Sequence, residues 1–173
     1  PQVVLGDREH GGEALVRAPE ADAVYVAAVV EALEETEPFV TLESLVRAVK
    51  DRPEAERAGA IATFTGQVRA REHADDDRTE YLTFEKYDGV AESRLDAIAE
   101  ELEGRDGVEA VRFHHRTGVI EAGEDIVFVV VLAGHRTEAF ETVSDGIDRL
   151  KDEVPIFKRE TTVEEDFWVH ERE

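Results

Sequence analysis

Apolar residues recur along this chain with two different periods, and the period separates predicted helices from predicted strands. A spacing of three to four residues predicts amphipathic helices over 19–36, 41–51, 90–104 and 137–154. In the last of these, the predicted buried stripe is Phe140, Val143, Ile147 and Leu150. Two-residue alternation or a short unbroken apolar run predicts strands instead. These strands span 59–69, 81–87, 107–118, 124–134 and 166–171.

The mixed order of these elements predicts an α+β fold in which a sheet and helices pack in layers. The run "IVFVVVLAG" at 126–134 is apolar on both faces and predicts a central, buried strand. Residues 70–80 are polar and acidic and predict a loop. Pro38 separates an N-terminal helical extension, residues 1–37, from a domain of residues 38–173. Two readings of the extension stay open, a harmless addition or the tail of an upstream domain.

The charge of the chain narrows the classes of partner. Its 173 residues include 42 acidic and 20 basic side chains, a formal net charge of -22. A field of that sign repels nucleic acid and anionic membranes, so neither is an expected partner. An acidic surface with little lysine is typical of a protein from a high-salt cytoplasm, where salt screens the self-repulsion. An acidic surface for binding a partner is the alternative.

Cysteine is absent, which limits the chemistry that the chain can perform alone. Without cysteine there is no thiolate nucleophile, no disulfide and no thiolate metal site. Any sulfur chemistry must therefore use sulfur that a partner delivers, and we predict no resident cofactor.

Two of the few lysines stand close together around one proline. The chain has only Lys50, Lys86, Lys151 and Lys158. Lys151 and Lys158 flank Pro155 in "LKDEVPIFKRE", where the proline ends the helix. Residues 156–161 are then predicted to run extended, so that Lys158 points to the face opposite Phe157 and Arg159. A chain that reverses at this proline can bring both ammonium groups to one pocket. Unlike arginine, a desolvated lysine can lose its proton and act as an acid, a base or a nucleophile. The simpler interpretation is that both lysines are ordinary surface cations, and that Lys151 is stabilised by the negative end of the helix dipole.

Other cations stand at predicted strand ends. Arg69 ends the strand 59–69, and His135 with Arg136 precedes the last helix, where free backbone N–H groups also favour an anion. A further cluster, "HHR" at 114–116, closes another strand. A cationic pocket on so acidic a protein predicts an anionic ligand.

Five blocks of the sequence occur together in a fixed order. They are "GAIATFTGQVR", "FEKYDGVAE", "FHHRTGVIEAGEDIVFVVVLAGHRTEAFE", "LKDEVPIFKRE" and "WVHERE". With them the chain resembles, from about Phe39 to Glu173, the family of molybdopterin synthase large (catalytic) subunits. The resemblance implies an α/β hammerhead fold and a homodimer. It implies a small ubiquitin-like partner whose C-terminal thiocarboxylate supplies two sulfurs, which convert cyclic pyranopterin monophosphate to molybdopterin in molybdenum cofactor biosynthesis.

The resemblance also assigns roles to residues. Lys151 and Lys158 match two functional lysines: Lys158 for acid–base or electrostatic work at the pterin, Lys151 beside the threaded C-terminus. Lys151 could also form an isopeptide bond with such a terminus. Positions that match substrate-binding or pocket residues are Arg69, His135, Arg136, Phe64, Arg159 and Arg172. Two residues depart from the family pattern. Gln67 stands where the family more often has a lysine or threonine, and Phe157 stands where the family usually has a tryptophan.

Two competing functions are weighed beside this one. The first is a docking module that binds a ubiquitin-like protein without catalysis, but a mere dock needs no cationic pocket. The second is a metal site from His114, His115 and Asp75–Asp77. Adjacent residues of a strand point to opposite faces, so one ion cannot readily take both histidines.

Overall fold

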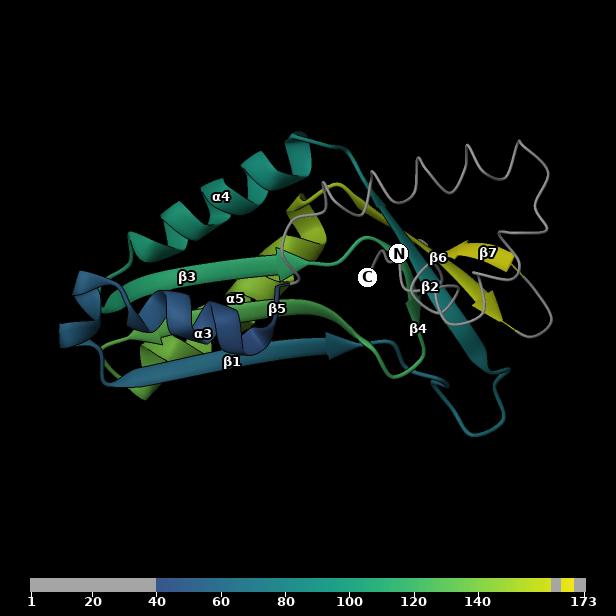
Figure 1. Cartoon of the computed structure of the whole chain (residues 1–173), viewed down its shortest axis with the longest axis horizontal. Coiled ribbons are helices and arrows are strands. Elements are labelled where there is room, and N and C mark those ends of the chain that lie inside the picture. Colours follow the sequence, from purple (N-terminus) through teal and green to yellow (C-terminus); the bar gives the residue numbers. More distant parts are fainter. Residues whose placement is uncertain (1–39, 163–165, 170–173) are drawn as a thin grey trace, which may run out of the picture. The chain divides into compact units, whose positions relative to one another are not determined.

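A computed structural model describes residues 40–162 and 166–169 (Figure 1). The helix expected at 19–36 and the extension 1–37 lie outside the described residues, so the domain boundary stays a prediction. The described elements are α3 (Leu42–Lys50), the short 3₁₀ helix η1 (Pro53–Arg57), β1 (Ala60–Gln67), β2 (Thr79–Lys86), α4 (Val90–Glu103), β3 (Val108–His115), β4 (Gly118–Glu121), β5 (Asp125–Ala133), α5 (Arg136–Glu153), β6 (Ile156–Thr162) and β7 (Asp166–Val169).

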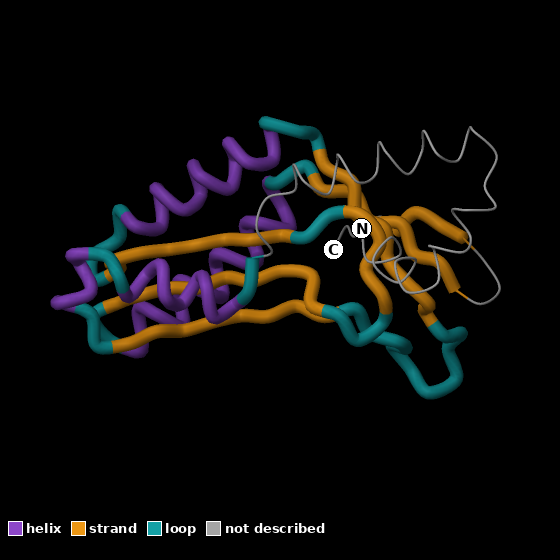
Figure 2. The backbone as a smooth tube through the Cα atoms, viewed as in Figure 1, coloured by secondary structure: helices purple, strands orange, loops and turns teal. Residues whose placement is uncertain are grey.

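The strands form two antiparallel sheets, which Figure 2 shows as two separate groups. The first sheet has the order β1-β5-β3, and the second has the order β4-β2-β6-β7. The predicted strand at 107–118 is wrong in its extent, because β3 ends at His115 and β4 begins at Gly118. Gly118 has φ +85°, a conformation that glycine adopts without strain, and the chain turns there into the second sheet. The α+β prediction is confirmed.

β5 is the central strand of the first sheet and is buried on both faces, as predicted. Every residue from Val127 to Ala133 is buried. On one face, residues such as Val129 and Val131 pack with α4 and α5. On the other face, Val130 and Leu132 pack with α3. The apolar side chains of the second sheet form their own cluster of Val68, Leu82, Phe84 and Ile120.

The helices begin and pack largely as their sequences predict. Thr41 caps α3, where its hydroxyl accepts from the N–H of Ser44 over 3.1 Å. In α4, Ile98 and Leu102 are fully buried, as their spacing predicts. None of the described helices is both long and apolar enough to span a membrane.

One predicted core residue of α5 is wrong, because Phe140 is 63% exposed. The buried positions of α5 are Ala139, Thr142, Gly146, Ile147 and Leu150. Three of these five buried residues, Ala139, Thr142 and Gly146, are small. A Cβ on Gly146 would lie only 3.3 Å from the ring of Phe113, so the glycine permits close packing of the helix on the sheet. The stripe predicted from the helical spacing is therefore right at Ile147 and Leu150, but at its N-terminal end Ala139 is buried in place of Phe140.

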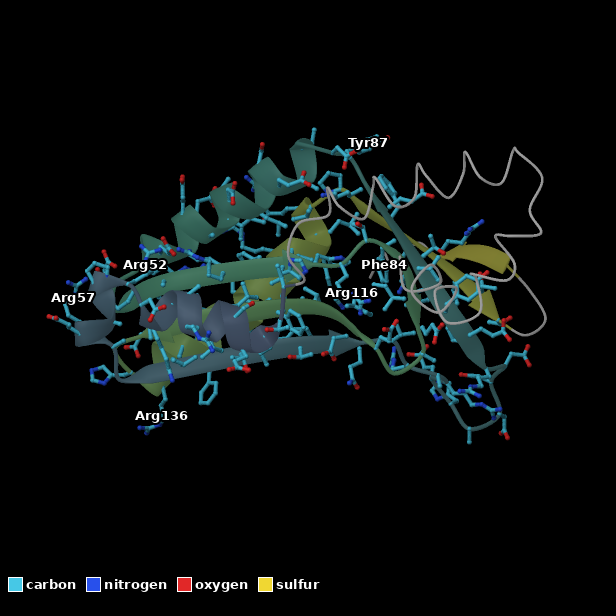
Figure 3. All side chains as sticks on the ribbon, viewed as in Figure 1. Arg52, Arg57, Phe84, Tyr87, Arg116 and Arg136 are labelled. Carbon is cyan, nitrogen blue, oxygen red and sulfur yellow. The ribbon has the colours of Figure 1, made fainter. Side chains whose placement is uncertain are left out.

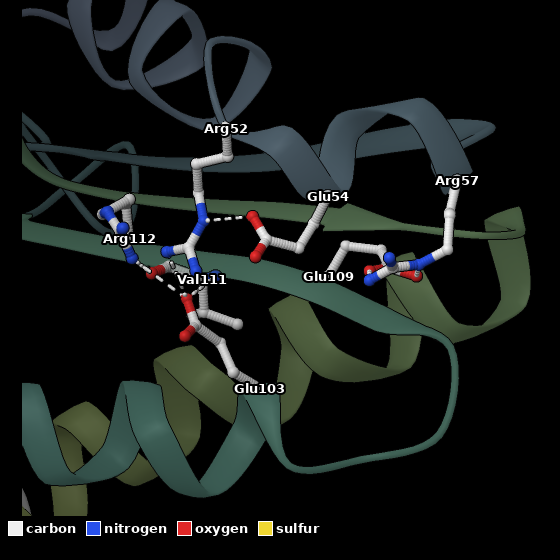
Figure 4. A network of polar contacts seen from close by, with 7 residues as sticks. All are labelled: Arg52, Glu54, Arg57, Glu103, Glu109, Val111 and Arg112. Atoms are coloured by element: carbon white, nitrogen blue, oxygen red, sulfur yellow. Dashed lines mark hydrogen bonds and ion pairs between the residues drawn. The ribbon is translucent and has the colours of Figure 1, made fainter.

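A charged network joins η1, α4 and β3 next to the buried core residue Val111 (Figure 4). Glu103 Oε1 accepts three hydrogen bonds, from the Val111 N–H over 2.8 Å, from Arg112 over 3.0 Å and from Arg52 over 3.4 Å. One carboxylate thus fixes the end of α4 against β3, which anchors the sheet at the end where α5 begins.

Candidate active site

Several elements end where the two sheets meet, a region that we call the sheet junction. β1 leaves the first sheet at Gln67, which pairs with Asp125 at the start of β5, and β3 ends at His115, which pairs with Val127. α5 begins at the opposite end of β5 and packs back along β1 and β5. Its C-terminus therefore approaches the sheet junction.

Arg69 lies two residues beyond β1, at the sheet junction. Its guanidinium pairs with Glu72 over 3.2 Å, and both side chains are more than half exposed. An ion pair this exposed adds little stability. An anionic ligand that offers better geometry can therefore draw Arg69 away from Glu72, which suits the substrate-binding role predicted for Arg69.

Lys151 and Lys158 flank the turn that carries the chain from α5 into β6. α5 ends at Glu153, and the Ile156 N–H donates to the Val154 carbonyl over 2.8 Å, which closes a tight turn. Lys151 is exposed near the helix end, whereas Lys158 is half-buried in β6. The predicted helix end and the strand after it are therefore confirmed.

Lys158 faces the second sheet's buried aromatic. In register it pairs with Phe84 of β2 and with Val169 of β7. Side chains directly opposite in an antiparallel pair lie on the same face of the sheet. Phe157 and Arg159, its neighbours along β6, belong to the other face, as predicted. Arg159 therefore does not share a face with Lys158 and is not brought together with it.

Glu153 lies between the two lysines and is held by arginines. The Arg149 Nε donates to Glu153 Oε1 over 2.7 Å, and Arg94 of α4 also donates to this carboxylate. The hydrogen bonds from Arg149 and then Arg94 lower the pKa of Glu153 to about 2. We call these contacts of Arg149 and Arg94 with the Glu153 carboxylate the Glu153 clamp. The clamp holds the last turn of α5, next to Lys151. Sequence reasoning missed it, although Arg149 and Glu153 have the i,i+4 spacing of a helical ion pair.

His135 and Arg136 lie at the other end of α5. His135 is its N-cap and Arg136 its first residue, both exposed. At 1.5 Å per residue, Arg136 and Lys151 are about 22 Å apart along the helix axis. Figure 3 likewise shows Arg136 near one end of the first sheet, and Phe84, the partner of Lys158 in the second sheet, beyond its other end. The exposed Phe140 lies one turn from Arg136, on the same side of the helix.

Phe64 lies midway between these two ends. It pairs with Val129 in the middle of β5 and packs, half-buried, against the core beneath α5. Its ring therefore contributes to the core as well as to any pocket beside α5. Arg172, the remaining predicted pocket residue, lies outside the described residues.

The two adjacent histidines of β3 point to opposite faces, as predicted. The His114 ring stacks on Phe128 with centroids 6.2 Å apart, whereas the His115 ring meets Phe84 edge to face at 5.0 Å. Within the part of the chain that the structure describes, no group of three acidic or histidine side chains could hold a metal ion. Sequence reasoning gave no signal for the His115–Phe84 contact, because it joins two different sheets.

Comparison with known proteins identifies relatives of this chain. The family model described as "MoaE protein" matches residues 35–153. A probable molybdopterin synthase of Haloferax volcanii is 65% identical over 158 residues, covering 91% of this chain. This chain spans only 60% of the length of that relative. The molybdopterin synthase catalytic subunit of Escherichia coli K12 is 42% identical over 120 residues, 69% of this chain and 79% of that protein.

A solved structure shares the fold. The crystal structure of molybdopterin synthase from Staphylococcus aureus superposes with a TM-score of 0.67 at 31% sequence identity, covering 78% of this chain and 93% of that one. The predicted fold class agrees with this neighbour. The high identity to a Haloferax protein also agrees with the halophilic origin predicted from the acidic composition.

Proposed function

The chain belongs to the MoaE protein family, and from this membership we propose that it is the catalytic subunit of a molybdopterin synthase. The reaction converts cyclic pyranopterin monophosphate to molybdopterin. Its sulfur comes from the C-terminal thiocarboxylate of a small ubiquitin-like subunit. We further propose a cytoplasmic setting at high salt, an expectation that rests on the acidic composition.

One observation carries the proposal: three cations come from separate elements that meet where the first sheet ends and the second begins. Arg69 follows β1, Lys151 ends α5 and Lys158 lies in the strand after the turn. Phosphate and thiocarboxylate are both anions, so both are suited to binding by these cations. The lack of cysteine in the chain fits a reaction in which sulfur arrives on a partner.

The chemistry gives the two lysines different tasks. When the thiocarboxylate sulfur bonds to a pterin carbon, a carbon–oxygen bond at that carbon breaks and the departing oxygen takes up a proton. The carrier remains attached through an acyl–sulfur bond, which water then cleaves, so that the carrier leaves as a carboxylate and the sulfur stays on the pterin. Lys158, half-buried beside Phe84, is suited to supply or remove a proton at the pterin. Lys151, exposed at the helix end, is suited to bind the carrier's anionic terminus.

The separation along α5 adds a second copy of the chain to the proposal. Arg136 cannot reach a ligand held by Lys151 of its own chain across about 22 Å of helix. A twofold dimer can bring the start of α5 from one copy to the end of α5 in the other. Phe140 supports this arrangement, because a 63% exposed aromatic one turn from Arg136 is suited to burial in an interface. We therefore propose that His135 and Arg136 serve the site of the partner copy.

Reconstitution at high salt tests the proposed activity. The native chain, a ubiquitin-like protein with a C-terminal thiocarboxylate and cyclic pyranopterin monophosphate are mixed, and the dithiolene product is measured. We expect product from the native chain and a loss of about a hundredfold or more in Lys158→Ala. Lys50→Ala is the matched control, because Lys50 is an exposed lysine of α3, and we expect it to retain native activity.

The same assay separates catalysis from docking. A chain that binds the thiocarboxylate carrier but yields no product, under conditions in which the Escherichia coli enzyme works, would be a docking module and would contradict the proposal. Product formation that is equal in Lys158→Ala and Lys50→Ala would instead remove Lys158 from the mechanism.

A further inference from the structure

His115 links the end of the first sheet to the face that carries Lys158. It is the last residue of β3, and its ring meets the edge of Phe84 at 5.0 Å with an interplanar angle of 69°. Phe84 is only 7% exposed and belongs to the apolar cluster of the second sheet. The ring of His115 therefore packs on an aromatic side chain that is itself held in place.

The hydrogen bonding of His115 fixes the orientation of its ring. His115 Nδ1 lies 2.7 Å from the carbonyl oxygen of Arg116. A carbonyl can only accept, so Nδ1 carries the proton and Nε2 carries the lone pair. The Arg116 backbone is anchored in turn, since its N–H donates to the Ile126 carbonyl and its guanidinium donates to the Asp125 carbonyl, each over 2.8 Å.

The ring is also uncharged at neutral pH. Burial, which penalises the charged form, lowers the pKa of His115 from 6.5 to about 4. The hydrogen bond to the Arg116 carbonyl opposes this shift, and the neighbouring His114 adds to it. A neutral imidazole therefore packs on the ring of Phe84 without bringing a positive charge to it.

Phe84 connects His115 to Lys158. Phe84 and Lys158 are directly opposite in the antiparallel pair of β2 and β6, an arrangement that places their Cβ atoms about 4.5–5.5 Å apart. The aliphatic stem of a half-buried lysine packs along an apolar neighbour of this kind. The contact of His115 with the edge of Phe84 thus fixes the aromatic surface against which the aliphatic part of Lys158 packs.

We propose that His115 is a positioning residue for Lys158, acting through the ring of Phe84. This inference rests on the proposed function, because it assigns Lys158 a place in catalysis. His115 does not touch substrate in this account. It orients Phe84, and Phe84 sets the direction of the Lys158 ammonium group. Losing the ring of His115 therefore lowers the turnover of bound substrate without weakening binding of either substrate.

Two substitutions separate the ring from the hydrogen bond. His115→Asn keeps a donor near the Arg116 carbonyl but removes the ring, whereas His115→Phe keeps the aromatic edge and removes the donor. We expect His115→Asn to lower kcat about ten- to a hundredfold with KM for the pterin unchanged, and His115→Phe to stay near the native kcat. The matched control is His114→Asn on the opposite face, which should also keep the native kcat.

Lysine-selective NMR provides a readout that does not need activity. The Cε and Hε signals of Lys158, assigned by comparison with Lys158→Arg, should shift in His115→Asn and stay in place in His114→Asn.

An inactive native chain would overturn the proposed function and leave this second test standing. Native kcat together with unshifted Lys158 signals in folded His115→Asn would overturn the positioning role. A loss that is equal in His115→Phe, or in His114→Asn, would do the same.

Discussion

Arg149 and Glu153 lie one turn apart on α5, and the Arg149 Nε donates to the Glu153 carboxylate over 2.7 Å. With Arg94 on the same carboxylate, this contact lowers the pKa of Glu153 from 4.5 to about 2. The stabilisation is complete above pH 4.5 and is lost as the pH falls through about 2, because protonation then removes the charge. The end of α5 is thus held by an ion pair throughout the neutral range.

The first prediction concerns this clamp. Glu153→Gln should lower the melting temperature at pH 6, and the difference from the native chain should shrink as the pH is lowered from 4.5 to 2. Melting curves at constant high salt give the measurement. A difference that stays the same at every pH would show that the charge of Glu153 does not hold the helix end.

The second prediction uses the pKa of His115. The unfolded chain takes up a proton near pH 6.5, but the folded chain does so only near pH 4. The contribution of the neutral His115 ring to the unfolding free energy should therefore be complete above pH 6.5 and fall by up to about 3 kcal/mol as the pH drops from 6.5 to 4. Denaturant unfolding of the native chain and of His115→Phe gives the measurement. The variant should lack this part of the slope, and an identical slope in both would contradict the burial of a neutral ring.

The third prediction concerns the network around Glu103. Glu103→Ala leaves the buried Val111 N–H and two arginines without this acceptor, which should lower the unfolding free energy by about 1–3 kcal/mol. Glu43→Ala is the control, because Glu43 pairs with Arg47 on the open surface of α3 and should cost less than about 0.5 kcal/mol. If urea unfolding shows the same loss of unfolding free energy in Glu103→Ala and Glu43→Ala, the network of Glu103 stabilises the fold no more than a surface ion pair does.

The fourth prediction tests the close approach of two loops at the end of the first sheet. A Cβ on Gly59 would lie 2.6 Å from the carbonyl oxygen of Gly134, which is backbone and cannot move aside easily. Gly59→Ala should therefore destabilise the fold by about 1–3 kcal/mol. At Gly104 the nearest atom would be 3.4 Å away and φ is −73°, so Gly104→Ala should be neutral or slightly stabilising. The reverse order of the two melting temperatures would contradict the packing described.

Local patterns carry much of this fold, and contacts between distant elements account for what they miss. The unbroken apolar run of β5 predicted a central strand, because apolar side chains on both faces must be buried. In the structure α3 covers one face of β5, and α4 and α5 cover the other. Phe140 was placed in the core because it continues the three-to-four-residue spacing of Val143, Ile147 and Leu150, whereas in the structure Ala139 and Gly146 are the buried positions beside it. The helical spacing alone cannot show which of two adjacent rows of side chains on a helix will pack against the sheet.

The candidate site shows the same division. The spacing of Lys151 and Lys158 around a proline was visible in the sequence, and so was the alternation that sets Lys158 apart from Arg159. The contact of His115 with Phe84 was not visible, since it depends on how two sheets meet. The predicted helix over 137–154 already implied that Arg136 and Lys151 lie at its two ends, and the structure confirms the continuous helix.

Subunit complementation tests the central claim most directly. Arg136→Ala and Lys158→Ala should each be inactive when assembled with themselves. Refolded together in equal amounts, half of the dimers contain one of each, and each such dimer has one site with native Arg136 and native Lys158. The mixture should then recover about one quarter of the native dithiolene-forming activity. If Arg136 served the Lys158 of its own chain, no intact site would form, and a mixture no more active than the two variants alone would contradict the account.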